Sequence, residues 1–231
     1  FMALLGSSET DAPRLLMELR KTFSYNPSDE EAGSGITAVT LGNVEKVGEY
    51  AFFASFISEV PAFTAETQIG KYAYAYTKIT SVTIPDGMEL AEGVFAQCSA
   101  LAEITVGNDV TLGDFAFNMD KDETFTVLNY DEDGEKYFYY QFSSALTSLS
   151  IGNNVTIGEN VFAYHASLTA VTLGENATIG KHAFYGLNKA SFFCEAGTIP
   201  PYWNERWNSS YRAVFWGCVL SEDGSYVTSV V

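Results

Sequence analysis

The sequence LTAVTLGENATIGKHAF, residues 168–184, decides the fold, because the chain repeats it several times with small changes. The preceding copy, residues 146–162, reads LTSLSIGNNVTIGENVF. The earlier copies are residues 36–52, 57–74, 79–95 and 101–117, of which 57–74 is the most degenerate. A period of about 22 residues is typical of proteins whose repeats stack as coils of a solenoid. We therefore predict a mainly β repeat solenoid of six coils, numbered 1 to 6 in chain order.

Each repeat carries the signals of a short strand followed by a bend. Val171 and Leu173 flank Thr172, and this alternation of β-prone residues predicts a strand with one face buried. A glycine follows at one place in most copies, where a bend needs either positive φ or close backbone approach. These glycines are Gly48, Gly70, Gly113, Gly158 and Gly180, and Ala91 takes their place in coil 3.

One aromatic residue occupies the same place near the end of every repeat. The series is Phe52, Tyr74, Phe95, Phe117, Phe162 and Phe184. Stacked coils bring such residues together, so we expect their rings to form a continuous structural spine. Removing one ring from this spine should cost roughly 3–5 kcal/mol through lost burial and a cavity. A single coil cannot bury both of its sides, so stability must come from neighbouring coils.

The remaining segments divide the chain around the six coils, which span residues 36–190. Residues 1–35 are predicted to contain a capping helix at about 11–25 and an acidic linker; binding of a partner by this helix is the alternative. Pro61 interrupts the strand of coil 2. Residues 191–231 do not follow the repeat template, and we expect them to form an irregular C-terminal capping unit. We expect its tryptophans to form the core of this cap, the alternative being a platform for a ligand; they are Trp203, Trp207 and Trp216.

An insertion at about residues 118–142 separates coils 4 and 5. Two aromatic runs flank Asp133-Gly134 there, and Asp-Gly between β-prone runs favours a β-hairpin. The acidic turn lacks the ligand series and flanking helices of an EF-hand, so it predicts no calcium site. The tyrosines of this hairpin either contact a partner or pack on neighbouring coils. The candidate partner-binding residues are Tyr130, Tyr137, Tyr139 and Tyr140.

Charge and cysteine content exclude several classes of function. The chain has 12 basic and 29 acidic residues and a formal net charge of -17, which disfavours nucleic acid and anionic membranes as partners. It contains neither an apolar run of about 20 residues, as membrane insertion requires, nor a recognisable signal peptide at its start. Cys98 is predicted to be a buried free thiol, whereas Cys194 and Cys218 either pair or stay free. We expect a monomer.

The residues that usually carry chemistry are not arranged for it. His165 and His182 occupy different places in neighbouring repeats and have no metal-ligand spacing around them. The chain has no nucleophile motif and no phosphate-binding loop, and its acidic residues fall at surface turns. We therefore predict no enzymatic activity, no cofactor and no metal site.

The segments LTSLSIGNNVTIGENVFAYHASL and VFAQCSALAEITV resemble the BspA-like leucine-rich repeat family of bacterial surface proteins. The C-terminal segment FFCEAGTIPPYWNERWNSSYRAVFWGC is similar to the closing unit of gut-bacterial members, which often carry the first of its cysteines unpaired. The resemblance implies a right-handed leucine-rich repeat solenoid, location at the cell surface or outside the cell, and a binding role.

Three hypotheses follow for function. The first is a noncatalytic recognition or adhesion module that binds a protein partner through the hairpin. The second is a carbohydrate-binding module, which requires exposed, coplanar rings among the insertion tyrosines or at Trp203 and Trp207. The third is a structural spacer, which would show no exposed aromatic group larger than an isolated ring.

Overall fold

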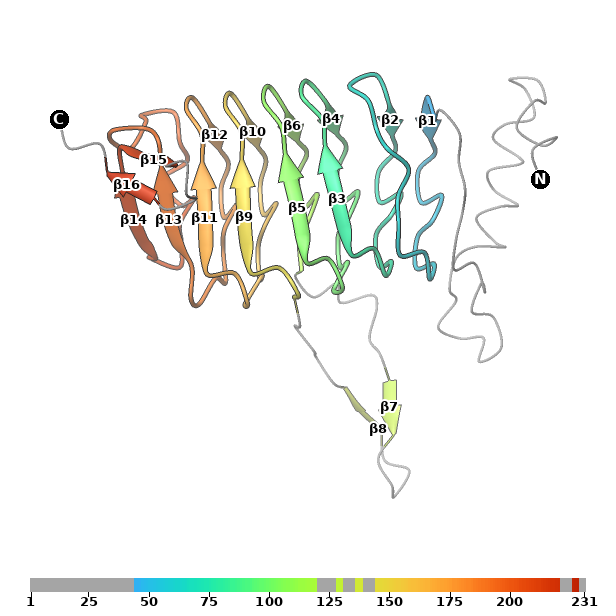
Figure 1. Cartoon of the computed structure of the whole chain (residues 1–231). Coiled ribbons are helices and arrows are strands. Elements are labelled where there is room, and N and C mark those ends of the chain that lie inside the picture. Colours follow the sequence, from blue (N-terminus) through green and yellow to red (C-terminus); the bar gives the residue numbers. More distant parts are fainter. Residues whose placement is uncertain (1–43, 120–127, 131–135, 139–143, 221–225, 229–231) are drawn as a thin grey trace.

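The computed structural model describes residues 44–119, 128–130, 136–138, 144–220 and 226–228. These residues wind into β-coils that stack side by side in a straight row (Figure 1), which confirms the predicted solenoid. The capping helix predicted at 11–25, the acidic linker and the strand of coil 1 lie outside the described residues.

The first side of the solenoid is a six-stranded parallel sheet, here called the long-strand sheet. Its strands are β3 (Ser81–Ile84), β5 (Glu103–Val106), β9 (Ser148–Ile151), β11 (Ala170–Leu173), β13 (Ser191–Cys194) and β14 (Ala213–Trp216). Exposed and buried residues alternate along β3, β5 and β9. Because successive side chains of a strand point to opposite faces, the aliphatic residues enter the core and the short polar ones face outward.

A second sheet of two-residue strands forms another side of each coil and is called the short-strand sheet. It comprises β4 (Glu89–Leu90), β6 (Thr111–Leu112), β10 (Thr156–Ile157) and β12 (Thr178–Ile179). In coils 1 and 2, β1 (Lys46–Val47) and β2 (Gln68–Ile69) pair separately. The recurrent glycine follows this strand, and a Cβ on Gly180 would lie 2.7 Å from the backbone of Gly158. Close coil-to-coil approach therefore explains this glycine.

The third side, called the turn side, is a run of turns with its own ladder of hydrogen bonds. Phe95 N donates to Ala116 O at 2.8 Å, and Phe162 N donates to Ala183 O at 2.8 Å, each bond reaching the next coil. The residue two places before the spine aromatic has positive φ in every coil, although its side chain differs from coil to coil. These residues are Tyr50, Tyr72, Gly93, Phe115, Asn160 and His182.

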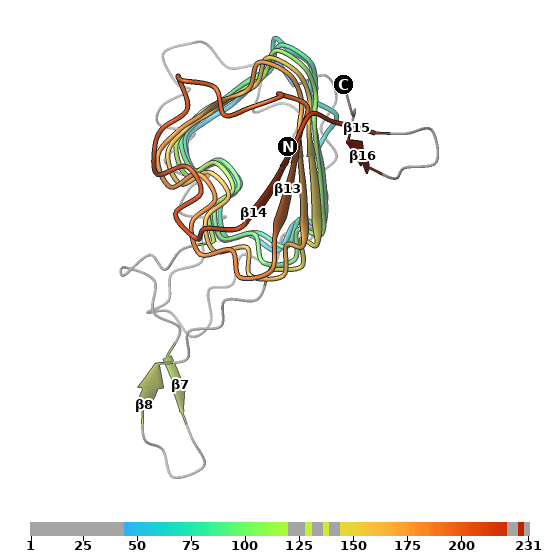
Figure 2. The same cartoon turned by 90° about the vertical axis from the view of Figure 1, so that its left-hand side faces the viewer.

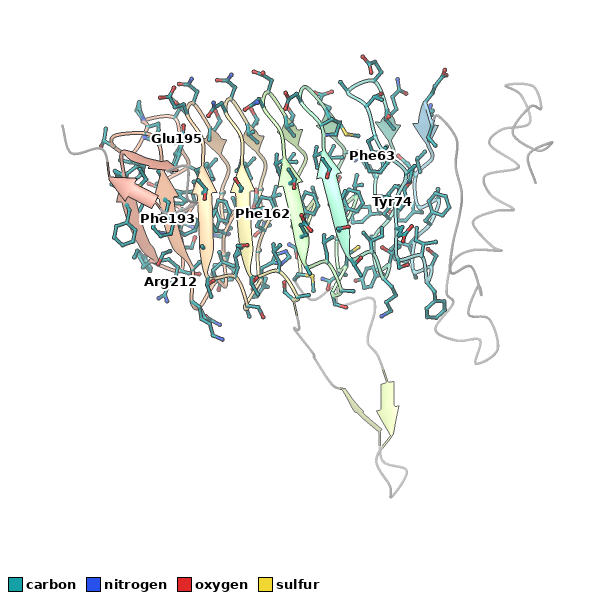
Figure 3. All side chains as sticks on the ribbon, in the orientation of Figure 1. Phe63, Tyr74, Phe162, Phe193, Glu195 and Arg212 are labelled. Carbon is teal, nitrogen blue, oxygen red and sulfur yellow. The ribbon has the colours of Figure 1, made fainter. Side chains whose placement is uncertain are left out.

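The six spine residues form one column of stacked rings inside the solenoid. Neighbouring centroids lie 5.1–5.6 Å apart, with planes within 11° of parallel. Five of the six rings are at most 1% exposed, and Phe52, in coil 1, is partly buried. Figure 3 shows Tyr74 and Phe162, which belong to this column, in different coils of the row.

The segment YAYAY in coil 2 differs from the arrangement expected for an extended chain. Tyr72 and Tyr76 have φ of 53° and 61°, so the backbone turns at both residues. As a result Tyr74 enters the core, while Tyr72 and Tyr76 pack outside it with Tyr50 and Phe53. The three tyrosines therefore do not share one side, as they would in an extended strand.

Two antiparallel hairpins interrupt this regular pattern. β7 (Leu128–Tyr130) pairs with β8 (Lys136–Phe138) within the insertion, and Figures 1 and 2 show them beyond the coil stack. Near the C-terminus, β15 (Cys218–Leu220) pairs with β16 (Tyr226–Thr228). Figure 2 looks along the row of coils and shows this second hairpin on the outer side of the long-strand sheet.

Candidate functional site

The outer face of the long-strand sheet is a regular surface formed by six parallel strands. Over β3, β5 and β9 its exposed side chains are Ser81, Thr83, Glu103, Thr105, Ser148 and Ser150. Apart from Glu103 these are short and uncharged. Such a surface is flat and lacks the aromatic or arginine anchors that usually carry binding energy.

This surface changes where β13 and β14 complete the sheet. Phe193 and Phe215 are register partners in these two strands, and their rings stack at 5.3 Å with an interplanar angle of 13°. Phe215 is 44% exposed. We call the two residues the sheet-end aromatic pair. The β15–β16 hairpin lies on the outer side of the long-strand sheet (Figure 2), where β15 contacts β13.

The strand that carries Phe215 is held in place by Arg212. The guanidinium donates from Nη1 to Asn188 O at 2.7 Å and from Nε to Ser210 O at 3.0 Å. The backbone N–H of Arg212 also donates to Asn208 Oδ1 at 3.0 Å. Figure 3 shows Phe193, Glu195 and Arg212 at this C-terminal end of the row. These hydrogen bonds fix the backbone directly before β14, the strand that carries Phe215.

Apolar exposure is concentrated in the same capping unit. Six large hydrophobic side chains are exposed in the described part of the chain, and four of them lie within residues 199–215. The four are Ile199, Tyr202, Tyr211 and Phe215. The sequence pattern does not single out Phe193 or Phe215, because the template ends near residue 190. Aligning SFFC of β13 with AVTL of β11 would have placed Phe193 at the outward position of Thr172.

The tryptophans of the capping unit form core. Trp203 is 7% exposed and Trp207 is 4% exposed, and their rings meet at 76°. Trp203 Nε1 donates to Ala177 O at 2.6 Å, which satisfies its polar group inside the protein. Trp216 is half-buried and packs against the core. The carbohydrate hypothesis was wrong about Trp203 and Trp207, because a sugar-stacking platform needs exposed, coplanar rings.

The four candidate tyrosines belong to the insertion. Tyr130 lies in β7 opposite Lys136, and Tyr137 lies in β8 opposite Asn129. Tyr139 and Tyr140, like the acidic turn at 131–135, lie outside the described residues. The hairpin thus carries two of the four on its paired strands.

A buried histidine, His165, links the two ends of this insertion by hydrogen bonds. His165 Nε2 lies 2.7 Å from Phe117 O, directly before the insertion, and Nδ1 lies 2.6 Å from Ser144 Oγ, directly after it. A carbonyl only accepts, so Nε2 carries the proton and Nδ1 accepts from the Ser144 hydroxyl. Ser144 Oγ in turn accepts from Leu146 N at 3.2 Å. Burial lowers the pKa of His165 to about 4, which keeps the imidazole neutral.

The cysteines are three buried free thiols. Cys98 lies among Thr77 Oγ1 and Tyr74 O, each at 3.2 Å, and burial raises its pKa to about 11. Burial raises the pKa of Cys194 to about 12, with a smaller contribution from nearby Cys218. Of the two arrangements open for Cys194 and Cys218, the structure has the unpaired one. High pKa and burial make all three poor nucleophiles.

Within the ranges that the structure describes, no three His, Cys, Asp or Glu residues come together as a group that could hold a metal ion. The same residues contain no helix with the length and hydropathy needed to cross a membrane. His165 is committed to structural hydrogen bonds, and the acidic residues of the turns bind backbone, as Asp114 Oδ1 does with Glu159 N at 2.7 Å.

Comparison with known families identifies the repeat. A family model described as a BspA-type leucine-rich repeat region matches in six copies, over residues 32–140 and 67–191. Searches of curated proteins and of solved structures returned no match. The family match covers well over half of the sequence and coincides with the stacked coils. The chain therefore belongs to the BspA-type leucine-rich repeat family.

Proposed function

We propose that this chain is a noncatalytic recognition module of a bacterial cell-surface or secreted protein, and that it binds a protein partner. The family supports this proposal, since leucine-rich repeat solenoids generally serve protein interaction and not catalysis. The net charge of -17 favours a partner that is not itself strongly acidic.

The observation that carries the proposal is the sheet-end aromatic pair. Stacked, partly exposed rings beside a flat polar sheet are the kind of anchor that dominates protein interfaces. A pure spacer would show isolated rings at most, whereas Phe193 and Phe215 stack at 5.3 Å. The pair therefore favours recognition over a spacer role.

The test is capture of partners from the proteins of the bacterium's surroundings on immobilised wild type and on the Phe215→Ser variant. Tyr185→Ser is the matched control, because Tyr185 is similarly exposed at 39% but lies on the turn side. We expect specific proteins to bind wild type and the Tyr185→Ser variant and to be lost from Phe215→Ser. Equal capture by all three would contradict a role for the pair.

The hairpin tyrosines remain a second proposed contact. Tyr130 and Tyr137 lie on paired strands of an element that extends from the coil stack, which is where a partner has access. Replacing Tyr137, Tyr139 and Tyr140 by Ser should weaken capture of the same partner while the unfolding transition stays unchanged. Undiminished capture would assign the contact to the sheet end alone.

A further inference from the structure

Both sheets of the solenoid end between coils 2 and 3. β3 is the terminal strand of the long-strand sheet, and β1 and β2 form a sheet separate from β4. The turn side continues across this joint, since Tyr74 N donates to Val94 O at 2.9 Å and the rings of Tyr74 and Phe95 stack at 5.5 Å. The coils therefore remain joined on one side while an edge of the long-strand sheet opens on another.

A groove of about 320 Å³ lies along this edge. It is lined by Val60, Pro61, Ala62, Phe63, Ser81, Val82, Thr83 and Pro85. Phe63 forms a buried apolar part of the lining and packs against Tyr74 and Phe95, with centroids 6.1 and 6.4 Å apart. Through Phe63, the lining of the groove therefore contacts the aromatic spine.

In the described residues, the backbone of coil 2 forms no strand pairing with β3. Lys78 N donates to Ile57 O at 3.0 Å and Thr80 N donates to Ser58 O at 3.2 Å, directly before β3 begins. Beyond this point, no backbone hydrogen bond joins Ser81 or Thr83 to coil 2 in the described part of the chain. Pro61 has no N–H to donate, and its ring constrains the backbone of coil 2.

The register shows which groups of β3 face the groove. Gly107 N, directly after β5, donates to Ile84 O at 2.9 Å, so Ile84 and Val82 direct their backbone groups toward β5. Alternate residues of a strand direct these groups to opposite sides. Ser81 and Thr83 therefore present their N–H and C=O groups to the groove, and both residues are exposed.

We propose that this groove binds an extended peptide segment of a partner protein, which adds to β3 as a further strand. An unpaired strand edge is the site for such strand addition, in which backbone hydrogen bonds provide affinity and alternate side chains provide specificity. Side chains that point inward would meet Phe63 and Val60, so apolar residues suit these positions. The site is separate from the sheet-end aromatic pair and from the hairpin.

The charges around the groove select a basic segment. Exposed carboxylates adjoin the lining residues: Glu59 precedes Val60, Asp86 follows Pro85, and Glu103 is the register partner of Ser81. With a net charge of -17, the whole chain reinforces this attraction. The expected ligand alternates apolar residues with Lys or Arg on the outward side.

The test uses a fluorescein-labelled peptide of alternating Val and Lys and measures its binding by fluorescence anisotropy. The Thr83→Pro variant removes an N–H that the sheet does not use, and proline is tolerated on edge strands. Thr83→Val keeps this N–H and is its matched control. We expect binding to wild type and to Thr83→Val, and about tenfold weaker binding to Thr83→Pro.

Two further comparisons keep the test decisive if Thr83→Pro does not fold. The peptide with proline at its central position should bind weakly, because it cannot pair along its length. Glu103→Lys should weaken binding more than Glu89→Lys, which changes an exposed carboxylate on the short-strand sheet. Equal binding of both peptides, or equal effects of the two charge reversals, would show attraction to an acidic protein only and overturn the proposal.

Discussion

His165 Nε2 donates to the carbonyl oxygen of Phe117 at 2.7 Å, although the two residues are 48 positions apart in the chain. The bond joins coil 5 to the end of coil 4, directly before the insertion. The other ring nitrogen of His165 contacts Ser144, directly after the insertion, so that one side chain holds both ends of it. A long insertion can therefore leave the solenoid without interrupting the stack. Phe117 and Phe162 remain neighbours in the spine, 5.4 Å apart.

This arrangement predicts an imidazole that resists protonation. His182→Asn leaves His165 as the single histidine, and Asn suits the site because Asn160 has the same φ of 55° at the equivalent place. NMR titration of this variant should give a pKa of about 4 for His165. An ordinary value of about 6.5 would show that His165 is not buried as described.

The same shift predicts a loss of stability in mild acid. The unfolded chain binds a proton at His165 below about pH 6.5, whereas the folded chain does so only near pH 4. The contribution of His165 to the free energy of unfolding is therefore complete above pH 6.5. It decreases by up to about 3 kcal/mol as the pH falls toward 4. Urea unfolding at several pH values measures it, with His165→Leu expected to lack this component.

The hydroxyl of Tyr74 predicts a stabilising substitution. Tyr74 Oη is buried without a hydrogen-bond partner among the described residues, at a place where most coils have Phe. Tyr74→Phe removes this unsatisfied group and keeps the ring in the spine. We expect the free energy of unfolding to rise by about 1 kcal/mol. A decrease measured by urea unfolding would mean that the hydroxyl has a partner.

The close spacing of the coils predicts different effects on stability when two glycines are replaced by alanine. A Cβ on Gly180 would lie 2.7 Å from Gly158 backbone atoms, whereas a Cβ on Gly197 would meet nothing within 4 Å. Gly180→Ala should lower the free energy of unfolding by about 2 kcal/mol, because backbone must move. Gly197→Ala should change it by less than about 0.5 kcal/mol. Similar values for the two variants would contradict the close contact between coils.

Most of the fold was predictable because the period of the sequence is also the period of the structure. Val171 and Leu173 show the strand, and the aromatic place near each repeat's end locates the spine. The position of Tyr72 was not predictable from alternation, since its backbone adopts positive φ within a run of turns. The sheet-end aromatic pair was missed because exposure there depends on how the last strands end the sheet.

Amide hydrogen exchange tests the central claim, that neighbouring coils stabilise each other, most directly. Phe95 N and Phe162 N donate to the next coil at 2.8 Å beside buried spine rings. These amides should therefore exchange only through global unfolding, at one common free energy that Phe162→Leu lowers for both. Fast exchange at either amide, or a Phe162→Leu effect confined to its own coil, would contradict a single cooperative stack.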